Sequence, residues 1–262
     1  MEAQESRLLA PPTNQEVHIN ALLDYERRRV ERENQKPGHL TGIDCPICRN
    51  RGIVWVLDEK HITPIMKRCE CMDRRAAESR IKKSGLTDAL QGLTFQTYTA
   101  REKWQLDIKK AAIEYARAPE GWFFIGGQVG CGKTHICTAI LNELLKNKAC
   151  VYMKWRDDVR DIKAKANDEA GSRLLERFKS APVLYIDDLF KGGITEADLN
   201  IAFEIINARY NSRSLLTIIS TEKYINELID LDEGIGSRIA QRSHGHQLEI
   251  GRDDRKNVRL RI

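Results

Sequence analysis

The sequence predicts an α/β protein in which a three-layer domain on a parallel sheet follows a small cysteine-rich module. Three observations carry this prediction: strand-like and helix-like segments alternate from about residue 94 onward, a glycine-rich loop joins one such strand to a helix, and four of the seven cysteines fall within residues 39–75. Alternation of buried strands with helices is typical of a sheet that carries helices on both faces. We therefore expect two domains, covering residues 1–90 and 91–262.

Four short apolar runs are expected to form the strands of this sheet, because a parallel strand that is buried on both faces is continuously apolar. These runs span residues 122–127, 150–155, 182–190 and 215–220. The segments between them have helical patterns, over residues 135–146, 172–179 and 196–210.

A further helix is expected near the amino terminus, over residues 17–33, where a strongly polar segment contains only a short apolar stripe. Ile19, Leu22 and Leu23 are too few to build a core alone. The stripe belongs either to a solvated helix or to a helix that docks on a partner, and the sequence leaves both interpretations open.

Residues 127–134, GQVGCGKT, match the phosphate-binding pattern G-x(4)-G-K-[ST] between a predicted strand and a predicted helix. Glycines let the backbone wrap closely around phosphate, and the amide groups at the start of the next helix attract the anion. Lys133 is expected to reach the β- and γ-phosphates of ATP, and the Thr134 hydroxyl to ligate Mg²⁺. The predicted nucleotide-binding residues are Gly127, Gln128, Val129, Gly130, Cys131, Gly132, Lys133, Thr134 and His135. A chance glycine-rich turn is the alternative, which the flanking strand and helix disfavour.

Two acidic residues follow the apolar strand that begins at Val183, at the edge of the sheet where ligands bind in open α/β folds. Asp187 is expected to hold Mg²⁺, and Asp188 to orient or activate the water that attacks the nucleotide. Paired acids that only cap a strand end are the alternative. Hydrolysis of ATP is favoured over GTP because the sequence lacks an N-K-x-D string that would recognise guanine.

The cysteines of the first module lie in two close pairs: Cys45, Cys48, Cys69 and Cys71. Four thiolates in this spacing are typical of a tetrahedral structural Zn²⁺ site, and the residues between the pairs are expected to form a hairpin. His61 is a substitute ligand if a cysteine of the second pair points away. A redox role is disfavoured because no thioredoxin-like βαβ pattern surrounds the CxxC string.

The overall composition indicates in which compartment the protein works but does not indicate a specific function. A net charge of +5 is compatible with a nucleic-acid partner but is also common among other proteins. No run of about 18 apolar residues predicts a membrane span, and the first residues lack the order of a signal peptide. We therefore expect a cytoplasmic protein with reduced cysteines.

The order of these motifs resembles the DnaC/DnaI-type replicative helicase loaders of bacteria and phages, within the AAA+ class. The resemblance rests on the cysteine module, SGL (84–86), the phosphate loop, IDDL (186–189) and GSRIAQR (236–242), and it spans nearly the whole chain. It implies that residues 1–90 bind a replicative DnaB-type helicase, which the protein delivers to DNA during replication initiation. It also implies ATP-dependent self-association into a ring or spiral, with weak ATPase activity in isolation.

The resemblance assigns a polar sensor to the end of the strand over residues 215–220. Many relatives have Asn at the position of Glu222, so this chain departs from the pattern, and Thr221 is the residue expected to contact nucleotide. About forty residues follow Glu222, too few for an arginine-bearing helix and a separate C-terminal helical lid domain. An AAA+ core without that lid domain is therefore expected.

Three arginines are assigned by the same resemblance. Arg242 is expected to be the arginine finger that acts on a neighbouring subunit, with Arg238, four residues earlier on the same helix face, as its alternative or partner. Arg259 is expected to contact phosphate within its own subunit. A solvated surface charge is the alternative for each.

Single-stranded DNA is an implied partner, because an inserted helix at residues 155–179 lines a DNA channel in this class. The candidate phosphate contacts are Lys154, Arg156, Lys163, Lys165 and Arg173. A solvated helix is the alternative. Two rival functions share these motifs: a transposition helper ATPase of the IstB kind, which normally lacks a cysteine module, and a zinc-dependent nucleic-acid binding protein whose nucleotide-gated domain does not hydrolyse ATP.

Overall fold

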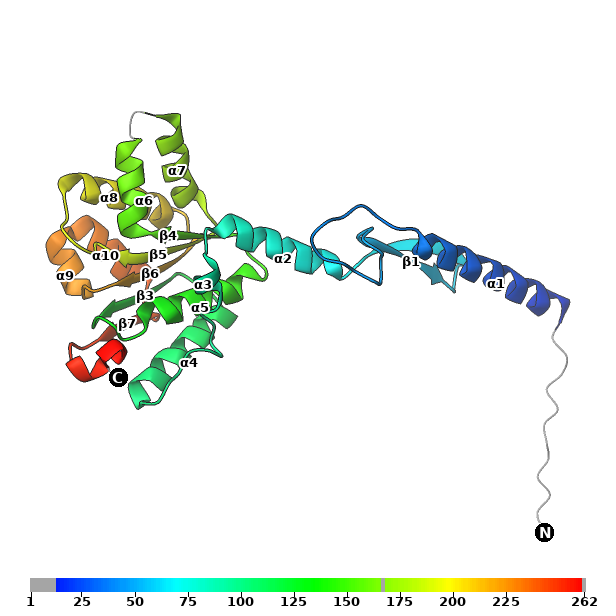
Figure 1. The fold of residues 1–262 in the computed structure, drawn as a ribbon, viewed down its shortest axis with the longest axis horizontal. Coiled ribbons are helices and arrows are strands. Elements are labelled where there is room, and N and C mark those ends of the chain that lie inside the picture. The colour runs from blue at the N-terminus through cyan, green and yellow to red at the C-terminus, as the bar shows by residue number, and fades with distance from the viewer. Residues whose placement is uncertain (1–12, 166–167, 261–262) are drawn as a thin grey trace, which may run out of the picture. The chain divides into compact units, whose positions relative to one another are not determined.

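The computed structural model describes residues 13–165 and 168–260 of the chain. It divides into two compact units, one reaching to Ala76 and the other beginning at Ala77 (Figure 1). The expected boundary between domains after residue 90 lies inside the second unit. No helix in the described part of the chain is long and apolar enough to cross a membrane.

The first unit combines one long helix with an antiparallel hairpin. Its elements are α1 (Asn14–Gln35), β1 (Ile53–Asp58) and β2 (Thr63–Arg68), and α2 (Cys71–Ser84) begins in it. The side-chain amide of Asn34 donates to the carbonyl of Trp55 at 2.9 Å and accepts from its N–H at 2.8 Å. Because this amide satisfies a strand backbone that has no partner strand on that side, it ties α1 to β1.

The second unit is built on a five-stranded parallel sheet with the order β4-β5-β6-β3-β7 (Figure 1). The strands are β3 (Trp122–Gly127), β4 (Cys150–Lys154), β5 (Val183–Leu189), β6 (Leu216–Thr221) and β7 (Gln247–Ile250). The four apolar runs identified in the sequence form β3 to β6. β7 was not predicted, because it is short and only Ile250 of its four residues is buried.

Helices cover both faces of this sheet. They are α3 (Asp88–Gln91), α4 (Lys103–Arg117), α5 (Lys133–Leu145), α6 (Trp155–Ala164), α7 (Glu169–Ser180), α8 (Glu196–Asn211), α9 (Ile225–Leu231) and α10 (Glu233–Arg242). Within the described residues, β7 is followed by the 3₁₀ turns η1 (Asp254–Lys256) and η2 (Val258–Leu260).

Two hydrophobic clusters lie on opposite faces of the sheet, because successive strand residues point to opposite sides. In β3, Phe123 and Ile125 pack with the cluster of α4 and α5, whereas Trp122 and Phe124 pack with the cluster of α6, α8 and α10. All four side chains are fully buried. The predicted three-layer α/β domain is therefore confirmed.

A fully buried arginine joins elements on one of these faces. The Arg209 guanidinium donates to the carbonyls of Phe178 and Ala181, each at 2.9 Å, and to that of Leu216 at 2.6 Å. It also donates to the Thr217 hydroxyl at 3.0 Å. Burial lowers the pKa of Arg209 to about 9, and carbonyl oxygens take the place of a counter-ion. The end of α7 and the start of β6 thus depend on one side chain of α8.

Substitution of Arg209 by leucine is expected to lower the free energy of unfolding by about 3 kcal/mol or more, because several buried carbonyls lose their donor. Urea denaturation would measure this change. Arg213→Leu, at an exposed arginine four residues later, is the matched control and should change the free energy by less than about 0.5 kcal/mol. Equal effects of the two substitutions would contradict the structural role of Arg209.

Candidate functional site

The phosphate-binding loop connects β3 to α5 at the carboxyl edge of the sheet. Gly130 has a φ of 72°, and a Cβ there would lie 1.9 Å from Oδ1 of Asn257. Gly127 has a φ of 100°, and its Cβ would lie 2.2 Å from the carbonyl oxygen of Ile250. Only glycine fits both the dihedral angles and the space, so the tight course of this loop depends on the glycines of the motif.

Lys133 is held inside the loop by backbone carbonyls. Its Nζ donates to the carbonyl oxygens of Gly127 at 2.8 Å and Gln128 at 2.6 Å, and the side chain is 6% exposed. Burial lowers the pKa of Lys133, and the nearby charges of Asp188 and Glu222 oppose that shift. A phosphate oxygen would give this ammonium a stronger, charge-assisted hydrogen bond than the two carbonyls do.

Asp187 receives hydroxyl hydrogen bonds from four different elements. Oδ1 accepts from Thr134 at 3.1 Å, Tyr185 at 2.6 Å and Ser220 at 2.7 Å. Oδ2 accepts from Tyr152 at 2.9 Å. Thr134 and Asp187, the two residues predicted to ligate Mg²⁺, therefore lie in direct contact. Their hydroxyl and carboxylate oxygens are the hard ligands that this cation prefers, so the donor set fits it.

The two tyrosines at Asp187 were missed by the sequence analysis, although a signal for one existed. Tyr185 lies two residues before Asp187, so the two side chains point to the same face of β5. Tyr152 stands opposite Tyr185 in the register of β4 and β5, which the sequence does not specify. These hydroxyls orient the carboxylate from two neighbouring strands.

Asp188 is directed by an irregularity of β5. The pairing of β5 with β6 shifts register between Ile186 and Leu189, and Asp188 has a φ of 57°. Its N–H donates to the Ser220 hydroxyl at 3.0 Å, and its carboxylate forms an ion pair with Lys191 at 2.7 Å. A bulge of this kind re-aims a side chain, and here it turns Asp188 toward the cavity beside the loop.

A cavity of about 290 Å³ lies at the phosphate-binding loop. It is lined by Leu93, Val129, Gly130, Gly132, Lys133, Thr134, His135, Asp188, Lys191, Glu222, Val258 and Arg259. The loop residues, Asp188 and Arg259 were predicted from the sequence. Leu93, Lys191 and Val258 were not, and Glu222 was considered only as the position of the sensor that Thr221 was expected to replace.

At the end of β6, the residues on either side of Thr221 lie at the nucleotide site, next to Asp187 or in the lining of the loop cavity. The Thr221 hydroxyl donates to the carbonyl of Leu189 at 2.7 Å, and the residue is fully buried outside the cavity lining. Ser220 instead contacts Asp187, and Glu222 lines the cavity, with its carboxylate 3.3 Å from Lys191. The contacts with Asp187 and Lys191 at this strand end are therefore made by Ser220 and Glu222, and Thr221 lies outside the cavity lining.

Arg238 and Arg242, both on α10, lie outside the lining of the loop cavity. Arg238 donates to the carbonyl of Gly234 at 2.7 Å, and its guanidinium carbon is 5.2 Å from the ring centroid of Phe203. Arg242 lines a second cavity of about 690 Å³ and lies over the ring of Trp122 at 5.8 Å. Neither arginine contacts the nucleotide cavity of its own chain, which is a requirement for a residue that would act on a neighbouring subunit.

Three of the five basic residues proposed to contact DNA are engaged in ion pairs. Lys154 pairs with Asp157 at 2.7 Å, Lys163 with Asp198 at 2.6 Å, and Arg173 with Glu169 at 2.9 Å. Arg156 and Lys165 have no ion-pair partner among the described residues. The pairs of Lys154 and Arg173 are exposed and contribute little stability, whereas Lys163 pairs with the buried carboxylate of Asp198.

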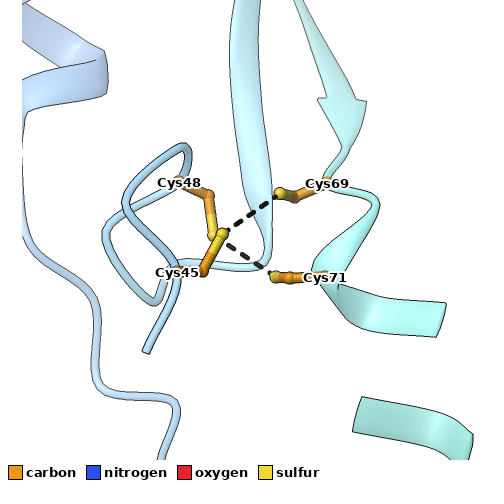
Figure 2. Close-up of side chains that lie close together, drawn as sticks. All are labelled: Cys45, Cys48, Cys69 and Cys71. Carbon is orange, nitrogen blue, oxygen red and sulfur yellow. Dashed lines mark hydrogen bonds between the residues drawn. The ribbon is translucent and has the colours of Figure 1, made fainter. Parts of the chain in front are cut away.

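The four cysteines of the first unit converge. Figure 2 shows Cys45 and Cys48 from one loop facing Cys69 and Cys71, which lie at the end of β2 and the start of α2. The Sγ atoms of Cys45 and Cys69 are 3.8 Å apart, those of Cys48 and Cys71 are 3.5 Å apart, and all four lie within 4.8 Å of one another.

These sulfur distances fit a tetrahedral zinc ion, for which Zn–S bonds of about 2.3 Å place the sulfurs about 3.8 Å apart. All four cysteines are buried. His61 is exposed, and its Nδ1 lies 2.7 Å from Oδ2 of Asp58, outside this group. The first unit therefore contains a four-cysteine cluster consistent with a zinc module, and the cluster is complete without histidine.

Comparisons with known proteins agree with this geometry. A family model described as the bacterial DnaA ATPase domain matches residues 91–243. Two Bacillus subtilis (strain 168) proteins are each 31% identical to this chain over 84% of its length: the uncharacterised protein YqaM, 86% of which is covered, and the phage-like element PBSX protein XkdC, 88% of which is covered. The solved structure of the DnaC helicase loader aligns with a TM-score of 0.53 and 20% identity, covering 63% of this chain and 99% of that one. The structural likeness shows a shared fold.

Proposed function

The chain belongs to the family of the bacterial DnaA ATPase domain, among the DnaA/DnaC-like AAA+ ATPases, and from this premise we propose that it is an ATP-hydrolysing loader of a replicative helicase. The observation that carries the ATP hydrolysis in this proposal is the contact of Thr134 with Asp187 at 3.1 Å, beside the buried Lys133. This contact brings the phosphate loop and the acidic strand together at one edge of the sheet, as ATP hydrolysis requires.

In the proposed reaction, the amides of the loop and Lys133 bind the β- and γ-phosphates. Mg²⁺, held by Thr134 and Asp187, would neutralise charge on the phosphates. Asp188 accepts a proton from a water molecule whose oxygen forms a bond to the γ-phosphorus. The bond from that phosphorus to the β–γ bridging oxygen breaks, and ADP and phosphate leave.

An arginine from a neighbouring subunit is proposed to complete the site. Arg242 is the first candidate and Arg238 the second, and both lie outside the loop cavity of their own chain. An arginine supplied in this way stabilises charge on the transferring phosphoryl group, so turnover depends on assembly into a ring or spiral. The isolated chain should therefore hydrolyse ATP slowly.

The first unit is proposed to bind a DnaB-type helicase through α1. Ile19, Leu22 and Tyr25 follow one another at intervals of three on this helix, and their side chains are 40%, 44% and 57% exposed. Apolar residues at this spacing form one face of a helix, which favours docking on a partner groove over a solvated helix. Zinc bound by the four cysteines would hold the hairpin that packs beside α1.

Single-stranded DNA is proposed as a second ligand of the ATPase domain, and the cytoplasm as its compartment. Arg156 and Lys165 are the candidates for phosphate contact that no acidic side chain engages among the described residues. Contacts of this type are electrostatic, so binding should weaken as salt concentration rises.

The proposal is tested by passing the purified DnaB-type helicase of the same source over the immobilised full-length protein, with and without ATP. We expect the hexameric helicase to be retained by the wild-type protein and lost from Leu22→Ser/Tyr25→Ser, because two anchors of the apolar face are removed. Glu31→Ser, an exposed polar residue of α1, is the control and should retain the helicase. Failure of the wild-type protein to retain it in either nucleotide state would refute helicase loading.

A further inference from the structure

One lysine that no motif of the sequence singles out lines two neighbouring cavities. Lys191 belongs to the lining of the nucleotide cavity. It also lines another cavity of about 300 Å³ between α6 and the start of α8, the α6/α8 cavity. A side chain shared in this way is able to respond to ligands on both sides.

In the nucleotide cavity, Lys191 is bound to the proposed base. Its Nζ lies 2.7 Å from Oδ2 of Asp188 and 3.3 Å from Oε1 of Glu222. Hydrogen bonding to Asp188 raises the pKa of Lys191, so the lysine stays charged. One lone pair of Asp188 Oδ2 is directed at this ammonium and is then unavailable to a water molecule.

The backbone holds this arrangement in place. Asp188 and Phe190 have φ angles of 57° and 58°, a conformation that residues with a side chain seldom adopt. The Phe190 ring packs edge-to-face against Trp155 at 5.2 Å, and Phe190 is buried. Phe190 anchors the chain before Lys191, whereas a Cβ at Gly192 or Gly193 would meet no atom within 4 Å, so the Lys191 side chain, 40% exposed, has space to turn.

The lining of the α6/α8 cavity contains more cationic side chains than carboxylates. Its lining contains the cations of Arg156, Arg160, Lys163 and Lys191, against the single carboxylate of Asp198. Asp198 pairs with Lys163 at 2.6 Å, and Arg160 pairs at 3.6 Å with Asp157, which lies outside the lining. Arg156 has no ion-pair partner among the described residues. A phosphate group that entered this cavity would compete with Asp188 for Lys191.

We propose that Lys191 is a positioning residue that restrains Asp188, and that a nucleic-acid backbone phosphate bound in the adjoining basic cavity draws Lys191 away and frees Asp188 for hydrolysis. This inference rests on the proposed ATPase function and adds the regulation of the same site. It makes ATP turnover respond to DNA through a single ion-pair exchange.

The test compares steady-state ATP hydrolysis by the full-length protein, Lys191→Met and Lys191→Arg, with and without a single-stranded oligothymidylate. In Lys191→Met we expect basal kcat to rise roughly fivefold, the size expected when one partly exposed ion pair is lost, with KM for ATP changed by less than about twofold. Stimulation by the oligonucleotide should disappear. Lys191→Arg, which keeps the cation, should retain both restraint and stimulation.

Two further variants and one further ligand sharpen the result. Arg160→Gln should raise the oligonucleotide concentration that gives half-maximal stimulation, because it removes a cation from the cavity. Lys148→Met, at an exposed lysine outside both cavities, should behave as the wild type. Inorganic phosphate should stimulate much less than the oligonucleotide, and equal stimulation would overturn nucleic acid as the ligand.

The outcomes separate this inference from the proposed function. If the wild type hydrolyses ATP but Lys191→Met shows an unchanged or lower basal kcat, or is still stimulated, the restraint by Lys191 is refuted and the ATPase stands. A wild type that hydrolyses ATP without any response to the oligonucleotide refutes the release step. If the wild type fails to hydrolyse ATP under all conditions, both proposals fall.

Discussion

Replacing Lys133 with alanine is expected to reduce the affinity for ATP by at least about a hundredfold, or about 2.7 kcal/mol. Lys133 is the buried cation of the phosphate-binding loop, and its ammonium is bonded only to the carbonyls of Gly127 and Gln128 within the described residues. Those carbonyls carry no formal charge, so a phosphate oxygen is the better acceptor. Alanine removes the charge and leaves the glycine-rich backbone in place.

Equilibrium titration with a fluorescent ATP analogue would measure this loss. Lys146→Ala, at an exposed lysine just after α5, is the matched control and should bind as the wild type does. The zinc content of Lys133→Ala should equal that of the wild type, because the cysteine cluster belongs to the other unit. An ATP affinity unaltered by the substitution would show that this loop is not the nucleotide site.

Replacing Cys48 with alanine is expected to release zinc and to unfold the hairpin unit. Among the described residues of that unit, the hydrophobic cluster consists of the four buried cysteines, with Val54 and Met72 packed beside them. A two-stranded hairpin with so small a core is not stable in water by itself. Structural zinc contributes about 10–16 kcal/mol in zinc-finger peptides, and loss of one of four thiolates forfeits most of that energy.

Metal analysis of the purified protein and limited proteolysis would follow this change. We expect one zinc per chain in the wild type, about none in Cys48→Ala, and rapid cleavage between β1 and β2 in the variant. His61→Ala should keep the metal, since His61 contacts Asp58 and not the cluster. A wild type without bound zinc, or a variant that keeps a full equivalent, would be incompatible with a structural zinc site.

The sequence predicted those parts of the fold that depend on local pattern. Apolar runs marked β3 to β6 because a strand covered on both faces has to be apolar at every position. The phosphate loop was identified because its backbone angles and close contacts tolerate little other than glycine, as at Gly130. β7 was missed because an edge strand with one buried residue has no such signature.

The composition of the site depended on long-range geometry that local pattern does not encode. Tyr152 reaches Asp187 because β4 pairs with β5 in one particular register. Lys191 is only three residues from Asp188, yet the irregular pairing of β5 with β6 at this point has no signature in the sequence. Neither the register of a parallel pair nor the position of a bulge follows from residue spacing.

The sequence by itself therefore determined which chemistry this protein carries: a triphosphate-binding loop, an acidic strand end and four thiolates in zinc spacing. These motifs are recognisable because each works through residues that are close together in the chain. Only the tertiary structure decided which side chains surround them, since Thr134, Tyr152 and Ser220 reach Asp187 from segments that meet across the sheet. The physical reason is that hydrogen bonds and ion pairs depend on distances in space, which the order of strands in the sheet establishes.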